Sequence, residues 1–134
     1  SMHGSKKGMA LTNNEFINWE DLYNNYLKKL INTIGYQKTT KGSIVAPIHL
    51  HFSTCNGMDA KIIATLNENS PYISLVGSNT TVNWSDSLVA FIILYHNTIH
   101  KENGPRKAVQ LMNAGAGINN VFEIDLAKGF HFIK

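Results

Sequence analysis

The first regular hydrophobic pattern in the chain has the spacing of a helix. Apolar side chains recur at steps of three and four residues and so would form one helical face: Trp19, Leu22, Tyr23, Tyr26, Leu30 and Ile34. Asn18 is a favourable N-cap residue, and Glu20 and Asp21 would follow in the first turn, where negative charge is stabilising. Gly35 can end the helix. The pattern therefore predicts an amphipathic helix between Asn18 and Gly35.

Two short segments farther along have the pattern of strands. Residues 48–53 alternate in hydrophobicity after Pro47, and the turn signal of residues 54–57 follows them. A helix is expected over residues 58–67, and a second strand over residues 72–76, ended by Gly77.

The second half of the chain predicts two helices and two terminal strands. Ser85 would cap a helix running to about Lys101, whose apolar run, residues 88–95, should be largely buried. Gly104 and Pro105 would end this helix and begin another. We expect a flexible break at residues 113–120, then strands at 121–124 and 130–133.

Strands that alternate with helices predict an α/β fold with a mainly parallel sheet. At 134 residues the chain is expected to form a single domain over 1–134. Residues 1–14 are polar and rich in Gly and Ser, and we expect a flexible loop there.

Composition narrows the functional classes. The chain is 43% hydrophobic and 16% charged, which argues against disorder, and no apolar run reaches the ~18–20 residues that span a bilayer, so no membrane partner is expected. The net charge is only +3, and Arg106 is the one arginine among scattered lysines, so no direct nucleic-acid partner is expected. A single cysteine fits a reducing compartment such as the cytoplasm.

That cysteine is the main chemical candidate. Cys55 would lie at the carboxyl end of a strand and just before a helix, where a thiolate is stabilised and where α/β proteins gather their chemistry. The alternative is a buried structural cysteine. Among possible histidine bases, His49 and His51 are too near in the chain to reach Cys55 easily, whereas His3 precedes it by 52 positions and is followed by Gly4.

Several short segments in order resemble one enzyme family. They are residues 1–5 with His3-Gly4, residues 50–57 with Cys55, residues 72–77, residues 85–87 with Phe91 and Tyr95, and Gly104 with Ala108. Together they span roughly residues 1–114 and are similar to the caspase–separase class of cysteine peptidases, in particular the bacterial CHAT type.

This resemblance implies a caspase-like three-layer sandwich and a cysteine endopeptidase that cleaves protein substrates without a cofactor or metal. Cys55 would attack the peptide carbonyl, His3 would activate the thiol and protonate the leaving amine, and the N–H groups of Gly4 and Cys55 would hold the oxyanion. Trp84 and Asp86 could border a specificity pocket, although the residue types themselves favour a core position for Trp84 and a first-turn helix position for Asp86.

The sequence also departs from the family pattern. Ser53 and Asn56 stand where caspases carry glutamine and arginine, so a requirement for aspartate in the substrate is not implied. Family members have further strands before the histidine loop. We therefore expect only the later part of such a domain here, with another polypeptide or segment completing the sheet.

Two other functions remain open. A zinc-binding domain could use His49 with His51, which share a strand face, or His96 with His100, which share a helix face. A non-catalytic caspase-like scaffold could instead bind a partner through the open edge of its sheet.

Overall fold

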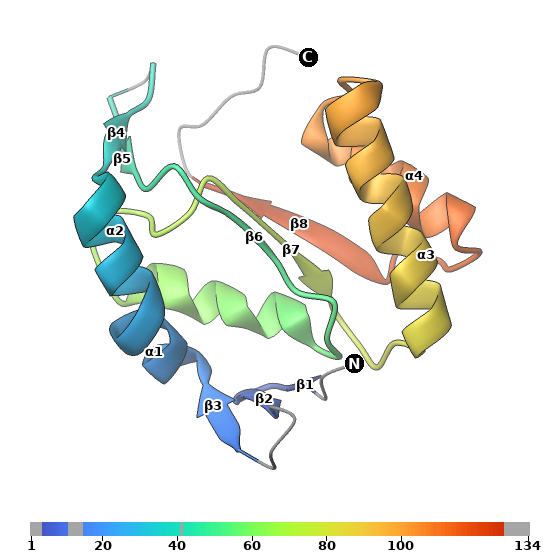
Figure 1. Cartoon of the computed structure of the whole chain (residues 1–134), viewed down its shortest axis with the longest axis horizontal. Coiled ribbons are helices and arrows are strands. Elements are labelled where there is room, and N and C mark those ends of the chain that lie inside the picture. Colours follow the sequence, from blue (N-terminus) through green and yellow to red (C-terminus); the bar gives the residue numbers. More distant parts are fainter. Residues whose placement is uncertain (1–3, 11–14, 41, 128–134) are drawn as a thin grey trace.

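The computed structural model describes residues 4–10, 15–40 and 42–127. These residues form an α/β fold in which a small sheet lies between two layers of helices (Figure 1). One layer contains the helices α1 and α2, and the other contains α3 and α4. The predicted α/β class is therefore confirmed.

The central sheet consists of β6 (His49–His51), β7 (Ser74–Ser78) and β8 (Phe122–Leu126), in that order. The pair β6–β7 is parallel and β7–β8 is antiparallel, so the expectation of a mainly parallel sheet is wrong. The reason lies in the connections. One helix joins β6 to β7 and restores the strand direction, whereas two successive helices, α3 and α4, join β7 to β8 and reverse it.

The strand β7 separates two hydrophobic cores. All five of its residues are buried, as is usual for a strand covered on both faces. Leu75 packs into the core on the α1–α2 side, and the next residue, Val76, packs into the core on the α3–α4 side. Successive side chains in a strand point to opposite faces, which accounts for this division.

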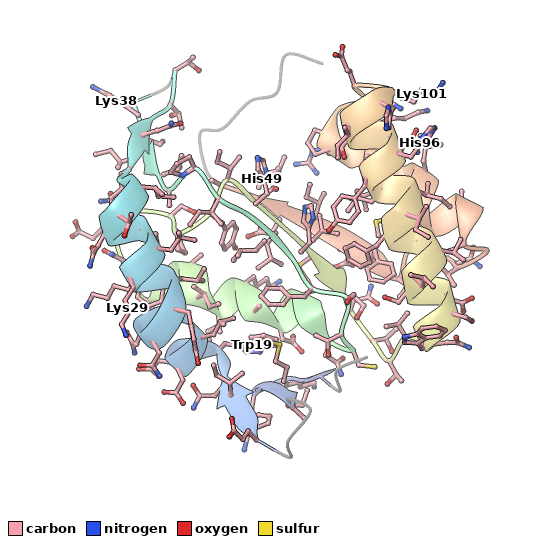
Figure 2. The ribbon with its side chains drawn as sticks, in the orientation of Figure 1. Trp19, Lys29, Lys38, His49, His96 and Lys101 are labelled. Carbon is pink, nitrogen blue, oxygen red and sulfur yellow. The ribbon has the colours of Figure 1, made fainter. Side chains whose placement is uncertain are left out.

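The first predicted helix is present with the expected ends. It runs through α1 (Trp19–Leu22), a π-helical turn η1 (Tyr23–Leu27) and α2 (Lys28–Ile34). The side chain of Asn18 accepts a hydrogen bond of 2.7 Å from the Asp21 N–H, and Gly35 ends the helix with a φ of +78°. Trp19 lies in the interior between this helix and the sheet (Figure 2).

The loop expected over residues 1–14 is wrong for the part that the structure describes. Two short strands, β1 (Gly4–Ser5) and β2 (Gly8–Ala10), pair antiparallel with each other, and β2 pairs with β3 (Phe16–Asn18). Met9 packs against the core on the α1–α2 side and so fixes this small sheet to the domain. Residues 1–3 and 11–14 lie outside the described residues.

The remaining elements frame the central sheet. They are the short hairpin of β4 (Gln37–Lys38) and β5 (Ile44–Val45), the 3₁₀ helix η2 (Gly57–Thr65), α3 (Trp84–Tyr95) with its π-helical extension η3 (His96–His100), and α4 (Pro105–Gly115). The helix predicted over 58–67 is therefore a 3₁₀ helix. Pro105 begins α4, as predicted.

The long helix differs from the prediction at its start and on its outer face. Asn83, rather than Ser85, caps α3: its side chain accepts the N–H groups of Ser85 (2.9 Å) and Asp86 (3.4 Å). The apolar run 88–95 is buried on one face only, and Ile92 is 60% exposed on the other. None of the helices in the described ranges is both long and apolar enough to cross a bilayer.

The expected break at residues 113–120 is also partly wrong. The helix α4 continues to Gly115, and Asn113 is buried. Its amide accepts the N–H of Phe122 and donates to the carbonyl of the same residue, both at 2.9 Å, which fixes α4 to β8. The strand expected at 130–133 lies outside the described residues.

Candidate active site

The turn between β6 and η2 holds Cys55 at the carboxyl end of the strand, as predicted. The ladder with β7 extends one residue past β6, since the Phe52 N–H donates to the Val76 carbonyl at 2.9 Å. The chain then reverses through Asn56, whose φ of +54° is left-handed, and the Gly57 N–H donates to the Thr54 carbonyl at 3.2 Å. Cys55 is thus held on a tight turn directly before η2.

The thiol of Cys55 is half-buried and bonded to a neighbouring backbone segment. Sγ accepts the N–H of Val82 at 3.3 Å and donates to the Val82 carbonyl at 3.6 Å. The Cys55 side chain is therefore neither enclosed in the core nor fully exposed.

Hydrogen bonds hold this turn against the end of β7 and the residues that follow it. Ser78 is completely buried, and its hydroxyl lies 2.9 Å from the Thr54 carbonyl and 3.0 Å from the Thr80 carbonyl. The Asn56 N–H donates to Thr80 as well, at 3.1 Å. A Cβ on Gly77 would lie 2.5 Å from the carbonyl carbon of Gly57, and a Cβ on Gly57 would lie 2.7 Å from Cβ of Phe52, so neither glycine has room for a side chain.

Gly4 connects the amino-terminal strands to the same turn. A Cβ on Gly4 would run into the carbonyl oxygen of Cys55 and would lie 2.6 Å from Oγ1 of Thr54. The structure thus brings together two of the three predicted catalytic residues, Gly4 and Cys55. The third, His3, lies outside the described residues.

A hollow of about 360 Å³ lies close to the turn, between the end of β6 and α3. Ser53, Trp84 and Leu88 contribute to its lining. Trp84 is 61% exposed, so the interpretation of this residue as part of the core is wrong. Asp86 does not line the hollow and is found in the first turn of α3, as the residue type itself suggested.

The two histidines of β6 share one face of the sheet, as predicted. His49 Nδ1 lies 2.6 Å from Ser74 Oγ, and His51 Nδ1 lies 3.1 Å from the Tyr95 hydroxyl. Burial lowers the pKa of His49, and burial together with the neighbouring His49 lowers the pKa of His51. Sequence reasoning missed both partners, because Ser74 and Tyr95 are distant in the chain.

The histidine pairs do not form a metal centre in the described part of the chain. The rings of His96 and His100 lie 5.6 Å apart, as expected for neighbours on one helix face. However, nowhere among the described residues do three or more histidine, cysteine or acidic side chains group so as to hold a metal ion. The zinc alternative therefore gains no support from this geometry.

Comparison with known proteins does not assign the chain to a family. No protein-family model matches the sequence, and no curated protein is significantly similar to it.

Proposed function

We propose that this chain carries the nucleophile of a cysteine endopeptidase with a caspase-like, CHAT-type active site. The observation that carries the proposal is the contact of Gly4 with the backbone of Cys55. These two residues are 51 positions apart, and the sequence resemblance requires them to meet. Gly4 directly follows His3 in the sequence, so the contact supports pairing of the His3 imidazole with the thiol.

In the proposed reaction the sulfur of Cys55 attacks the carbonyl carbon of a peptide bond. A carbon–sulfur bond forms, the carbon–nitrogen bond breaks, and His3 transfers the thiol proton to the leaving amine. Water then hydrolyses the thioester, with His3 acting as base. No cofactor is needed for these steps.

The oxyanion that forms during the attack needs N–H donors. The Asn56 N–H donates to the Thr80 carbonyl and the Gly57 N–H donates to the Thr54 carbonyl, whereas no described residue accepts the N–H of Cys55. We assign the N–H of Cys55 to the oxyanion site together with that of Gly4. Loss of one such donor typically lowers the rate by ~10²–10³-fold.

The hollow beside Trp84 is the natural place for a substrate side chain. Among the described residues, its lining combines the apolar groups of Leu88 and Phe91 with the hydroxyls of Ser53 and Ser87 and the ring of His51, whose pKa is lowered by burial, and it includes no carboxylate or ammonium group. It therefore suits a substrate residue without charge, in line with the absence of the family's glutamine and arginine at Ser53 and Asn56.

We propose that the enzyme cleaves proteins in a reducing compartment such as the cytoplasm. A second polypeptide segment would complete the sheet of the enzyme. The supporting observation is that β6 is the outermost strand of the described sheet and pairs only with β7. An open strand edge offers unsatisfied backbone groups for a further strand. If a partner binds this edge but Cys55 has no catalytic activity, the chain is a non-catalytic scaffold rather than an enzyme.

The proposal is tested by peptide cleavage. A peptide library derived from a whole proteome is incubated with the full chain, and new termini are identified by mass spectrometry. Cleavage should be abolished in Cys55→Ala and in His3→Ala, whereas the matched control His96→Ala, altered on the exposed surface, should cleave like the wild type. Equal cleavage by wild type and Cys55→Ala would remove Cys55 from the mechanism.

A further inference from the structure

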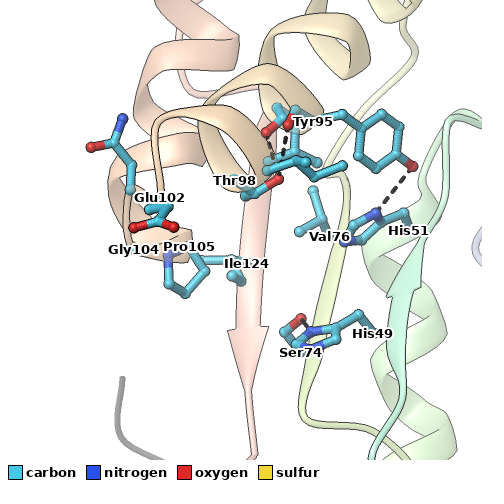
Figure 3. Close-up of a pocket in the computed structure, with 13 residues that line it drawn as sticks. His49, His51, Ser74, Val76, Tyr95, Thr98, Glu102, Gly104, Pro105 and Ile124 are labelled. Carbon is cyan, nitrogen blue, oxygen red and sulfur yellow. Dashed lines mark hydrogen bonds between the residues drawn. The ribbon is translucent and has the colours of Figure 1, made fainter. Parts of the chain in front are cut away.

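A second and larger cavity, of about 720 Å³, opens between the sheet and the carboxyl end of the long helix (Figure 3). Its walls are mainly apolar and include Val76 and Ile124 from the sheet, Ile99 from η3 and Pro105 from α4. A mostly apolar cavity of this size with a few converging polar groups is typical of small-molecule sites.

Two of the polar groups of the cavity come from β6. Figure 3 shows the imidazole rings of His49 and His51 directed from the strand into the cavity, where Nδ1 of each ring meets a hydroxyl of the wall. The hydroxyls belong to Ser74, which is 2% exposed, and to Tyr95.

These contacts fix the tautomer of both rings. Among the described residues, the His49 ring is the one hydrogen-bond partner of the Ser74 hydroxyl, and the His51 ring is that of the Tyr95 hydroxyl. A buried hydroxyl proton left without an acceptor is costly, so the hydroxyl of Ser74 donates to Nδ1 of His49. Tyr95 is 43% exposed, and its hydroxyl is assigned as the donor to Nδ1 of His51 because a phenol is a better donor than acceptor. Burial also raises the pKa of Tyr95, which keeps its phenol protonated as a donor. Each neutral ring therefore carries its own proton on Nε2.

Both Nε2–H groups are available to a ligand. Neither has a hydrogen-bond partner in the described part of the chain, and neither is among the fully enclosed polar atoms that lack one. Residues two apart on a strand lie about 7 Å apart, so one carboxylate, with two acceptor oxygens, can lie between the two rings.

We propose that this cavity binds a small organic acid, with its carboxylate between Nε2 of His49 and Nε2 of His51 and its apolar body against Ile99, Pro105 and Ile124. His51 and Tyr95 also line the hollow beside Trp84, but Cys55 does not line this cavity, and the binding proposed here does not depend on the peptidase activity.

The charges around the cavity define how binding depends on pH. The titratable groups that line it are His49, His51, Tyr95 and Glu102, with Glu102 exposed at the mouth. Burial lowers the pKa of both histidines, so the rings are neutral at neutral pH before a ligand binds. A bound carboxylate favours the protonated ring. Affinity for an organic acid should therefore rise as the pH falls.

The experiment uses three probes of nearly the same shape: phenylacetate, phenylacetamide and phenethylamine. Each is titrated at millimolar concentration into the full-length chain labelled with ¹⁵N-histidine, and the ring resonances are followed by NMR. Without ligand, His49 and His51 should show the Nε2–H tautomer. Phenylacetate should shift these two rings and bind roughly tenfold or more tightly than the amide, because hydrogen bonds to a charged acceptor are the stronger ones.

Variants test the same site independently. His49→Gln and His51→Gln should each weaken phenylacetate binding by about tenfold, whereas the matched control His96→Gln, on the exposed surface of η3, should not. Tyr95→Phe should move the His51 proton partly to Nδ1, an NMR signature that a merely structural tyrosine would not produce.

Three results would overturn the proposal. They are an Nδ1–H tautomer for both rings, binding of phenethylamine in preference to phenylacetate, and no shift of either ring with any probe. All three are read on the wild-type protein, so the test stands even where a variant fails to fold. Cys55→Ala should bind phenylacetate normally, which separates this site from the proposed peptidase centre.

Discussion

Replacing Gly77 by alanine is expected to loosen the turn that carries Cys55. The new Cβ would lie 2.5 Å from the carbonyl carbon of Gly57 and 2.6 Å from the backbone nitrogen of Met58, whereas ordinary van der Waals contact begins at 3.4 Å. Both atoms belong to the backbone, so no side-chain rotation can relieve the clash. The start of η2 must instead move away from β7 by roughly 1 Å, which disturbs the turn just before it.

This movement lowers the free energy of unfolding, whereas the change from glycine to alanine by itself raises it slightly. Overpacking of a well-packed interior typically costs ~1–3 kcal/mol, and alanine recovers about 0.5–1 kcal/mol over glycine because it restricts the unfolded chain. We therefore expect a net loss of about 1–2 kcal/mol in the free energy of unfolding. For a domain of this size, that corresponds to a fall in Tm of roughly 3–10 °C.

Two measurements report on the variant. Urea denaturation followed by far-UV circular dichroism gives the free energy of unfolding. The rate of modification by a coloured disulfide reagent reports on Cys55 alone, because the chain has one cysteine. Gly77→Ala should be less stable and should react severalfold faster, since movement of the turn breaks the bonds between Sγ and Val82.

Gly35→Ala is the matched control. Gly35 has a φ of +78° and a ψ of 174°, a backbone region that essentially only glycine adopts, and a Cβ on this residue would meet no atom within 4 Å, so alanine there costs about 1–3 kcal/mol through backbone strain alone. It should destabilise the protein to a similar extent without changing the reaction rate of Cys55. If Gly77→Ala is as stable as the wild type, or if both variants react at the wild-type rate, the packing argument for the turn is wrong.

Three further predictions concern other parts of the molecule. Asn113→Ala should lower the free energy of unfolding by ~2–4 kcal/mol in urea denaturation, because it leaves the N–H and the carbonyl of Phe122 buried without their partner; a loss below about 0.5 kcal/mol would contradict this. The pKa values of His49 and His51 are lowered in the folded protein, so the unfolded chain binds more protons and the free energy of unfolding should fall as the pH drops below 6.5. A double variant with glutamine at both positions should show a flatter pH profile in the same assay, and an unchanged profile would exclude these histidines as the cause. Gly4→Ala should lower kcat/KM for peptide cleavage by roughly 10²-fold or more while the protein stays folded, because the clash with the Cys55 carbonyl oxygen displaces its backbone by more than about 1 Å and spoils the alignment of the site; wild-type kinetics would show that the contact has no catalytic role.

Local sequence signals predicted the features that local chemistry controls. Asn18, Gly35 and Pro105 mark the ends of helices as expected, because capping and the fixed φ of proline act within one turn. The placement of Cys55 after a strand was also predictable, since the alternating segment and the turn signal that follows it are adjacent in the chain.

Features that depend on distant contacts were not predictable in this way. The direction of β8 depends on how many helices precede it, and the bond between His51 and Tyr95 joins residues 44 positions apart. Ser85 and Asn83 are both good capping residues, and a difference of two positions decides which side-chain oxygen reaches the free N–H groups.

The exposure of the long helix shows the same limit. Its run of apolar residues predicted that the helix is largely buried, yet only the face with Ala90, Phe91 and Leu94 packs into the core. Trp84 was expected inside on residue type alone, whereas its position in the first turn of α3 places it on the surface beside the candidate active site. The hydrophobic pattern therefore predicted the helix correctly but did not show that its second face is exposed.

The central claim, that Cys55 is a catalytic nucleophile, is tested most directly by pre-steady-state kinetics with a peptide 4-nitrophenyl ester. The full chain should release one equivalent of nitrophenolate in an initial burst, and mass spectrometry of acid-quenched protein should find the peptide acyl group on Cys55. Absence of both burst and adduct, or a burst of equal size in Cys55→Ala, would contradict the account.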